Sequence, residues 1–233
     1  MFWSGGKDSA LALYRVLKTE EYDVKYLVTT VNSTFKRISM HGIREELLDK
    51  QAEATGISLI KMHVKEGTNK EYEEILLEQF TAFKKEGIDY VIYGDIFLED
   101  LRKYRDALLE KAAMKGVYPL WKEDTKKLIN EFLKSEFKTI TCCVNDAFLN
   151  ENWVGREVDE KFIEELPDKV DACGENGEFH TFCFAGPIFK QEIKFVSGEK
   201  IYKPLEIKTS DCNLPESKTQ GFWYCDLTIP YRE

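Results

Sequence analysis

The string Ser-Gly-Gly-Lys-Asp-Ser at residues 4–9 constrains this chain more than any other feature. It follows a short apolar start at residues 1–3 and precedes residues 10–17, whose apolar spacing is helical. A strand, a glycine turn and a helix N-terminus in this order bind phosphate, because free N–H groups and the helix dipole face the anion. The sequence therefore predicts a phosphate-binding loop made of Ser4, Gly5, Gly6, Lys7, Asp8 and Ser9.

The residue order of this loop differs from that of a Walker A loop. A Walker A loop needs a glycine where this chain has Met1, and a serine or threonine where it has Asp8. A carboxylate repels bound phosphate unless a cation lies between them, so Asp8 indicates Mg²⁺, which prefers carboxylate and phosphate oxygens. The alternative interpretation is a glycine turn capped by serine, with the lysine and the aspartate solvated.

Strands and helices alternate along the first half of the chain. The patterns predict strands at 24–31, 58–64, 90–93 and 117–120, and helices at 43–55, 71–86 and 98–114. Further on they predict a helix at 125–135 and strands at 138–144, 179–184, 192–196, 200–207 and 222–230. Such alternation is typical of parallel βαβ units and a doubly wound sheet. We therefore expect an α/β protein with a nucleotide-binding domain at 1–122 and a smaller α/β domain at 123–233.

Composition and charge argue against a disordered, a membrane-spanning and a nucleic-acid-binding protein. Hydrophobic residues make up 43% and charged residues 32%, which is typical of a globular chain. No apolar run approaches the roughly 20 residues that span a bilayer, and no signal peptide is visible, so we expect a cytoplasmic protein. The net charge is −9, with 18 basic and 20 acidic residues at 1–120 and 15 against 22 at 121–233. Nucleic-acid binding needs a positively charged surface, so we do not expect this acidic chain to have a nucleic-acid partner.

Six cysteines occur, and no two of them form a C-x-x-C pair. We expect reduced thiols and no metal cluster, because cluster ligands are closely spaced. Cys142 and Cys143 lie in an apolar run, which favours a core role over a nucleophilic one.

A second cluster of polar residues lies at 173–182 (CGENGEFHTF). Asn176 and Gly177 form a strong turn signal. In an extended segment, Glu178 and His180 share one face, where a carboxylate and an imidazole can orient a substrate or move a proton. Because the cluster is distant in sequence from the phosphate loop, we expect it to face a second substrate. The alternative is a hairpin loop whose polar side chains are solvated.

Single residues beside the predicted strands are weaker candidates. Asp95 follows a strand at the carboxyl edge of the sheet and is expected to bind metal or ribose, with a helix N-cap as the alternative. His41 and Arg44 are expected to reach phosphate or substrate, with a surface helix start as the alternative. Arg102 and Arg105 are neighbours on one helix and form either an anion clamp or, the interpretation we favour slightly, a solvated face.

The loop string resembles the PP-loop of the ATP pyrophosphatases, which cleave ATP between the α- and β-phosphates. Further strings narrow the resemblance to the diphthine–ammonia ligase family and, in the segment around His41, to its bacterial-type relatives. These strings are MHGIR at 40–44 with Leu47, Leu48 and Gln51; Tyr93-Gly94-Asp95; GENGEFHTF at 174–182; Pro119-Leu120-Trp121; and Gly155-Arg156 with Asp159.

The resemblance implies a Rossmann-like (HUP-type) parallel-sheet domain that binds ATP and Mg²⁺. It implies that the loop residues, Thr30, Gly94 and Asp95 contact ATP, and that Asp8 and Asp95 hold Mg²⁺. The implied catalytic residues are Lys7, Asp8, Glu178 and His180. The implied substrate-binding residues are His41, Arg44, Glu175, Asn176, Gly177 and Thr181.

The implied reaction activates a carboxylate as an acyl-adenylate, releases pyrophosphate and transfers ammonia to the acyl group. The acceptor, a protein or a small molecule, and the oligomeric state are left open, with a homodimer as one option. Two other functions stay open: a PP-loop enzyme that modifies tRNA, and a protein that binds ATP without catalysis. Pyrophosphate and AMP formation separates the ligase from the non-catalytic protein.

Overall fold

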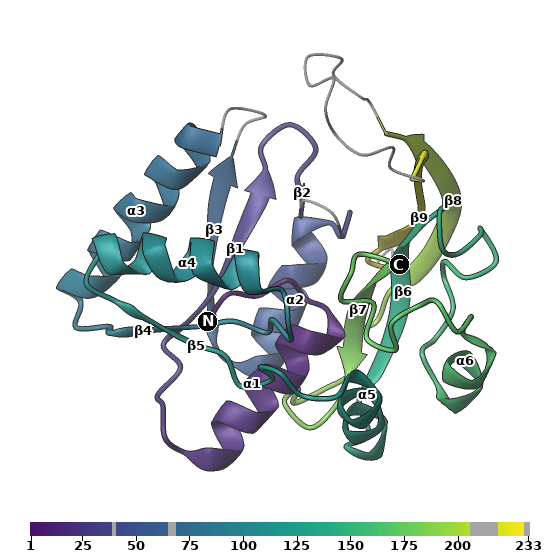
Figure 1. The fold of residues 1–233 in the computed structure, drawn as a ribbon, viewed down its shortest axis with the longest axis horizontal. Coiled ribbons are helices and arrows are strands. Elements are labelled where there is room, and N and C mark those ends of the chain that lie inside the picture. Colours follow the sequence, from purple (N-terminus) through teal and green to yellow (C-terminus); the bar gives the residue numbers. More distant parts are fainter. Residues whose placement is uncertain (39–40, 65–68, 206–218, 231–233) are drawn as a thin grey trace.

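The computed structural model describes residues 1–38, 41–64, 69–205 and 219–230. Figure 1 shows two α/β halves side by side. The first half contains helices α1 (Lys7–Thr19), α2 (Glu45–Thr55), α3 (Asn69–Lys85) and α4 (Glu99–Lys111). Its strands are β1 (Tyr26–Asn32), β2 (Arg37–Ile38), β3 (Ser58–Val64), β4 (Tyr90–Ile92) and β5 (Lys115–Val117).

Parallel pairing joins the strands of the first half, as the alternation predicts, except for the two-residue β2, which pairs antiparallel with β1. β1 pairs in parallel with β3, and β4 pairs in parallel with β5. Residues 1–3 lie between these two pairs: Phe2 N–H donates to the Ile92 carbonyl at 2.9 Å and Trp3 N–H to the Val28 carbonyl at 2.8 Å. The order is therefore β3, β1, residues 1–3, β4, β5, which is consistent with a Rossmann-like doubly wound sheet.

The second half is an antiparallel sheet in the order β7-β6-β9-β8. Its strands are β6 (Lys138–Asn145), β7 (Phe179–Ala185), β8 (Val196–Pro204) and β9 (Gly221–Thr228). Helices α5 (Thr125–Lys134) and α6 (Glu160–Glu165) accompany it. Asp124 caps α5 and Asp159 caps α6, each by accepting a hydrogen bond from a backbone N–H of the first turn.

One hydrophobic core runs through both halves. It contains Leu13 of α1 and Leu47 of α2 together with Phe132 of α5 and Phe182 of β7, each at most 1% exposed. A second, smaller core lies between the parallel sheet and helices α3 and α4. Helices therefore cover both faces of the parallel sheet, and α1 and α2 also join it to the antiparallel one.

Most predicted elements appear within two residues of their expected bounds. The helix expected at 98–114 is α4, which ends three residues early, at Lys111. The strand expected at 117–120 is β5, Lys115–Val117, and the segment that follows it is a turn. The strand expected at 192–196 is an extended loop in which the buried Ile193 packs beside Phe184. β8 begins at Val196 and is exposed along its whole length, so no apolar alternation marks its start. Met40, Cys212 and part of the segment expected at 200–207 lie outside the described residues.

Candidate functional site

A pocket of about 430 Å³ opens where the carboxyl ends of β1 and β4 meet the N-terminus of α1 and the start of β7. Most predicted site residues line it: Ser4, Lys7, Asp8, Ser9, Thr30, His41, Gly94, Asp95, Glu175, His180 and Thr181. A larger cavity of about 570 Å³ lies at the amino ends of the same strands, around Tyr26 and Tyr90, and contains none of these residues. Ligands of open α/β sheets bind at the carboxyl ends, so the smaller pocket is the candidate site.

The phosphate loop has the backbone geometry that its glycines predict. Gly5 has φ +76°, and a Cβ there would lie 2.7 Å from Oε1 of Gln51. A Cβ on Gly6 would lie 3.0 Å from the Thr181 carbonyl oxygen. Gly6 is the N-cap of α1 and has no side chain to cap the helix, while the N–H of Lys7 in the first turn donates to Oγ1 of Thr181 at 3.0 Å. The α1 N-terminus therefore faces the pocket, with the Asp8 carboxylate in its first turn.

Lys7 is 3% exposed and points back into the protein. Its Nζ donates to both carboxylate oxygens of Asp8 at 2.8 Å and to the carbonyl of Cys173. Burial disfavours the charged ammonium, but the charge and hydrogen bond of Asp8, together with the charges of Cys173 and Glu175, outweigh burial and raise the pKa of Lys7. Lys7 is therefore a cation at neutral pH, held at the floor of the pocket by the carboxylate beside it.

The 174–183 segment packs directly on the phosphate loop, contrary to the expectation that it faces only a second substrate. Lys7 N–H donates to Oγ1 of Thr181 at 3.0 Å, and Cys183 N–H donates to the Gly5 carbonyl at 2.8 Å. The buried Gln51 amide donates to the carbonyls of Gly5 and Cys183 at 2.9 and 2.6 Å. Separation along the chain was a poor guide, because β7 runs beside the loop.

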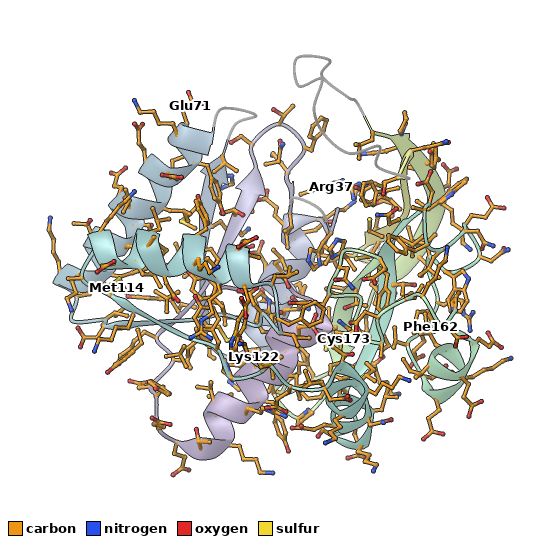
Figure 2. The ribbon with its side chains drawn as sticks, in the orientation of Figure 1. Arg37, Glu71, Met114, Lys122, Phe162 and Cys173 are labelled. Carbon is orange, nitrogen blue, oxygen red and sulfur yellow. The ribbon has the colours of Figure 1, made fainter. Side chains whose placement is uncertain are left out.

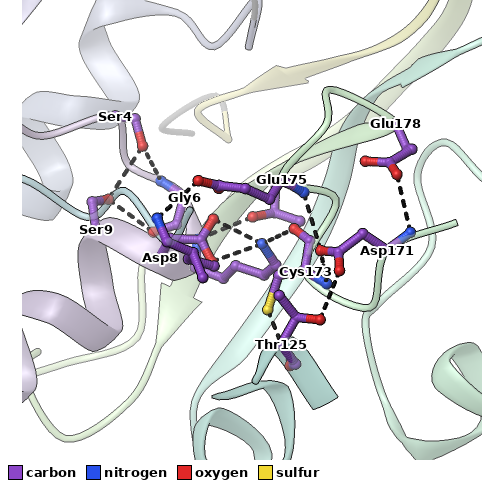
Figure 3. A network of polar contacts seen from close by, with 12 residues as sticks. Ser4, Gly6, Asp8, Ser9, Thr125, Asp171, Cys173, Glu175 and Glu178 are labelled. Atoms are coloured by element: carbon purple, nitrogen blue, oxygen red, sulfur yellow. Dashed lines mark hydrogen bonds and ion pairs between the residues drawn. The ribbon is translucent and has the colours of Figure 1, made fainter. Parts of the chain in front are cut away.

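Glu175 and Glu178 differ in their position relative to the pocket, and the sequence did not indicate this difference. Glu178 is 1% exposed and does not line the pocket. Its carboxylate accepts hydrogen bonds from Asp171 N–H at 3.0 Å, from Asn176 N–H at 2.9 Å and from the Asn176 amide at 3.0 Å. Figure 3 shows Glu178 on the far side of this loop from Asp8. We therefore propose that Glu178 shapes the loop, in place of the catalytic role predicted for it.

Glu175 lies in the pocket wall and accepts a hydrogen bond from Ile96 N–H at 2.8 Å. Burial, helped by the negative charge of Asp8, raises the pKa of Glu175 to about 7. This carboxyl group can therefore exchange a proton near neutral pH. Asn176 and Gly177, by contrast, form the predicted turn outside the pocket lining.

The expected alternation of faces also fails at the start of β7. His180 and Thr181 both line the pocket, although they are neighbours in a strand. The register with β6 shifts between Thr141 and Cys143, opposite these two residues. Such an irregularity re-aims side chains locally, so three consecutive residues, Phe179, His180 and Thr181, line one cavity.

His41 and His180 come from different halves of the chain and meet at the pocket wall. Their ring centroids lie 4.5 Å apart with an angle of 34° between the planes. His41 Nδ1 lies 3.4 Å from the Thr181 carbonyl oxygen, to which it donates. Burial lowers the pKa of His41 to about 4 and lowers that of His180 as well, so both rings are neutral at pH 7.

Arg105 lines the pocket and is not part of a solvated face, which corrects the interpretation favoured from the sequence. It forms an ion pair with Asp95, and its guanidinium lies 4.4 Å from the ring centre of Tyr93. Burial raises the pKa of Asp95 while Arg105 opposes this change. Asp95 is not the N-cap of α4, since Leu98 holds that position. Arg102, on the same helix, lies 4.5 Å from the ring centres of Tyr118 and Trp121.

Arg44 does not line the pocket, contrary to the role predicted for it. Its guanidinium pairs with Asp226 of β9 at 2.8 Å, and Arg37 donates to the same carboxylate at 2.9 Å. Figure 2 shows Arg37 reaching from β2 toward the antiparallel sheet. The two arginines therefore connect the halves of the molecule, a role for which the sequence gave no signal.

The described cysteines are all free and buried: Cys142, Cys143, Cys173, Cys183 and Cys225. Burial raises the thiol pKa of each of them and, in Cys143, to about 12. Thiols in this state are weak nucleophiles at neutral pH. The core role predicted for Cys142 and Cys143 is confirmed by their burial.

A glycine loop between the first extended segment and the first helix of a parallel sheet is consistent with a Rossmann-like α/β protein. Two family models match it: diphthamide synthase N-terminal domain over residues 1–116, and diphthamide synthase C-terminal domain over residues 124–210. The chain belongs to the diphthamide synthase family. The resemblance found in the sequence is thereby confirmed.

Curated relatives carry the name diphthine–ammonia ligase. The protein of Danio rerio is 26% identical over 227 residues, which cover 85% of this chain and 86% of the relative. Those of Bos taurus and Mus musculus are 27% and 28% identical over 123 residues, 51% of this chain. In these two matches the aligned part spans about half of the relative, 46% of its length.

Proposed function

We propose that this protein is an ATP-dependent ligase that cleaves ATP to AMP and pyrophosphate and amidates a carboxylate with ammonia. The observation that carries the proposal is the pocket at the N-terminus of α1, which has Lys7 and Asp8 at its floor. The names of the relatives support a ligase of the diphthine–ammonia type. At this similarity the acceptor need not be diphthine, so we leave its identity to experiment.

In this proposal the ATP phosphates lie on residues 4–9, and the fold is the HUP-type variant of a Rossmann-like domain. Thr30 and Gly94, at the ends of β1 and β4, border the nucleoside. A Cβ on Gly94 would lie 3.0 Å from the backbone of Asp8, so this glycine leaves room for the loop. Tyr93 and Arg105 extend the same wall and offer an aromatic face and a positive charge.

Asp8 and Asp95 are the residues that would hold Mg²⁺. They fit the ion, because both line the pocket and the charge of Asp8 contributes to the raised pKa of Asp95, so the two carboxylates interact. Among the described residues, no three His, Cys, Asp or Glu side chains cluster as metal ligands. Phosphate oxygens and water would therefore complete the coordination. When bound, Mg²⁺ neutralises charge on the departing pyrophosphate.

The residues of the pocket have distinct roles in this reaction. Lys7 and the α1 N-terminus stabilise negative charge that develops on the phosphates. Glu175, with a pKa of about 7, accepts a proton from the nitrogen nucleophile as it attacks. The raised thiol pKa values support a route without a covalent cysteine intermediate. No helix in the described part of the chain has the length and apolar composition that a membrane-spanning segment needs.

The test is product analysis with ATP, Mg²⁺, ammonium and a panel of carboxylate acceptors. The expected products are AMP and pyrophosphate, formed only with Mg²⁺ and a suitable acceptor. Lys7→Ala and Asp8→Ala should each weaken ATP binding or turnover at least tenfold while the chain stays folded. Lys18→Ala, at the other end of α1, is the matched control. ATP binding at wild-type affinity in both loop variants would refute the assignment, and ATP that is bound but never cleaved would favour a non-catalytic protein.

A further inference from the structure

Nε2 of His180 is a buried nitrogen without a hydrogen-bond partner. Among the described residues, only this atom and Oγ1 of Thr139 are buried side-chain polar atoms in that state. A buried polar atom without a partner costs roughly 1–3 kcal/mol, so native proteins rarely keep one without a reason. Thr139 is 0% exposed and lies outside the pocket lining, whereas His180 lines the pocket. The site therefore contains an unused hydrogen-bonding position.

The ring that carries this nitrogen is fixed in place by its neighbours. The ring of His41 packs against it, tilted by 34° with the ring centroids 4.5 Å apart, and His41 is itself held by the Thr181 carbonyl. The side chain of Thr181 accepts the hydrogen bond from Lys7 N–H at the start of α1. The imidazole of His180 is thus connected, through two residues, to the loop that we propose binds phosphate.

The charge around His180 favours an anionic ligand. Lys7 and the α1 N-terminus supply positive charge on this side of the pocket. A neutral imidazole always carries one N–H, and it can donate that hydrogen without adding a buried charge. A cationic ligand such as ammonium would be repelled by Lys7, so an oxygen anion is the better partner for this nitrogen.

We propose that His180 donates a hydrogen bond from Nε2 to a phosphate oxygen of the bound nucleotide, and that His41 positions the ring for it. This proposal rests on the proposed function only in requiring that the loop binds phosphate. It moves His180 from the acceptor side, where the sequence placed it, to the phosphate side. His41 acts through His180 and is a positioning residue.

Imidazole ¹⁵N NMR tests this contact without any knowledge of the acceptor. The chain has three histidines, and the third, His63 in β3, is exposed and serves as an internal reference. Inorganic pyrophosphate or α,β-methylene-ATP is added with Mg²⁺ to the full chain labelled at histidine. The Nε2 resonance of His180 should shift at saturation while that of His63 stays unchanged. Calorimetry on the same samples shows whether the probe is bound.

Two substitutions distinguish the hydrogen bond of Nε2 from the packing of the His180 ring. His180→Phe keeps an aromatic ring against His41 but removes the donor, and His180→Gln removes the ring but keeps an N–H donor. Pyrophosphate affinity should fall about tenfold or more in His180→Phe and less in His180→Gln, whereas a purely packing role predicts the reverse order. If neither variant folds, the NMR experiment on the wild type still decides.

Bound pyrophosphate with no change at His180 would overturn this contact and leave the proposed function intact. If neither probe binds the wild-type chain, both the contact and the proposed function are wrong.

Discussion

Replacing Gln51 by leucine is the most direct test of how the phosphate loop is held. Gln51 of α2 is 0% exposed and touches three segments at once. Its Oε1 accepts from Trp3 Nε1 at 2.8 Å, and its Nε2 donates to the carbonyls of Gly5 and Cys183. Leucine has a similar volume but no polar atom, so the change removes these hydrogen bonds with little change in packing.

The cost follows from the groups that lose a partner. The indole N–H of Trp3 and the carbonyl of Cys183 lose this partner inside the protein, while the Gly5 carbonyl keeps the bond from Cys183 N–H. At about 1–3 kcal/mol for each unsatisfied buried group, less the gain from an apolar side chain, we expect a loss of ~2–4 kcal/mol. For a chain of this size, that corresponds to a fall in Tm of roughly 4–16 °C.

Urea unfolding and ATP calorimetry on Gln51→Leu measure both consequences. We expect ATP affinity to fall at least tenfold, because the loop loses a direct support. The control is Lys50→Ala, one position earlier on the exposed side of α2, whose ion pair with Glu53 should contribute less than about 0.5 kcal/mol. If Gln51→Leu unfolds within 0.5 kcal/mol of the wild type and binds ATP equally well, Gln51 does not support the loop.

Three further predictions follow from the pocket. The pKa of Glu175 rises from 4.5 to about 7 on folding, so between these pH values the folded chain binds more protons than the unfolded chain. The free energy of unfolding should therefore fall by up to ~3 kcal/mol as pH rises from 4.5 to about 7. Urea unfolding at pH 4–8 should show this slope in the wild type and lose it in Glu175→Gln. In Gly94→Ala the added methyl group should push on the Asp8 backbone, which should lower stability by ~1–3 kcal/mol in thermal melts and weaken ATP binding. Unchanged ATP binding would contradict this close approach of Gly94 to the loop. The double variant Cys173→Ser, Cys183→Ser should keep most of its ATP-to-AMP turnover, whereas loss of turnover in a folded variant would indicate sulfur chemistry.

Local patterns predicted much of the fold and of the phosphate loop. Glycines, helical spacing and the carboxyl edge of the sheet correctly indicated α1, β1 and a pocket that contains Lys7, Asp8 and Asp95. These features depend on neighbours in sequence or on regular parallel packing, which a single sequence expresses well.

Contacts between distant segments could not be predicted in the same way. Which of Glu175 and Glu178 enters the pocket depends on where β7 begins and on the shift in its register with β6. The sequence indicated the pairing of Arg105 with Asp95 only weakly, through two opposite charges ten positions apart on either side of a helix start. The sequence gave no indication of the hydrogen bond between Lys7 and Thr181.

That last contact has a consequence for the order in which the protein is made. Lys7 and Thr181 are 174 positions apart, so the loop is synthesised long before the strand that supports it. At about 5–20 residues per second, roughly 9–35 s separate the two during translation. A nascent chain that has folded only its parallel sheet therefore lacks one wall of the pocket. We expect nucleotide to bind, and to stabilise the chain, only after β7 has left the ribosome.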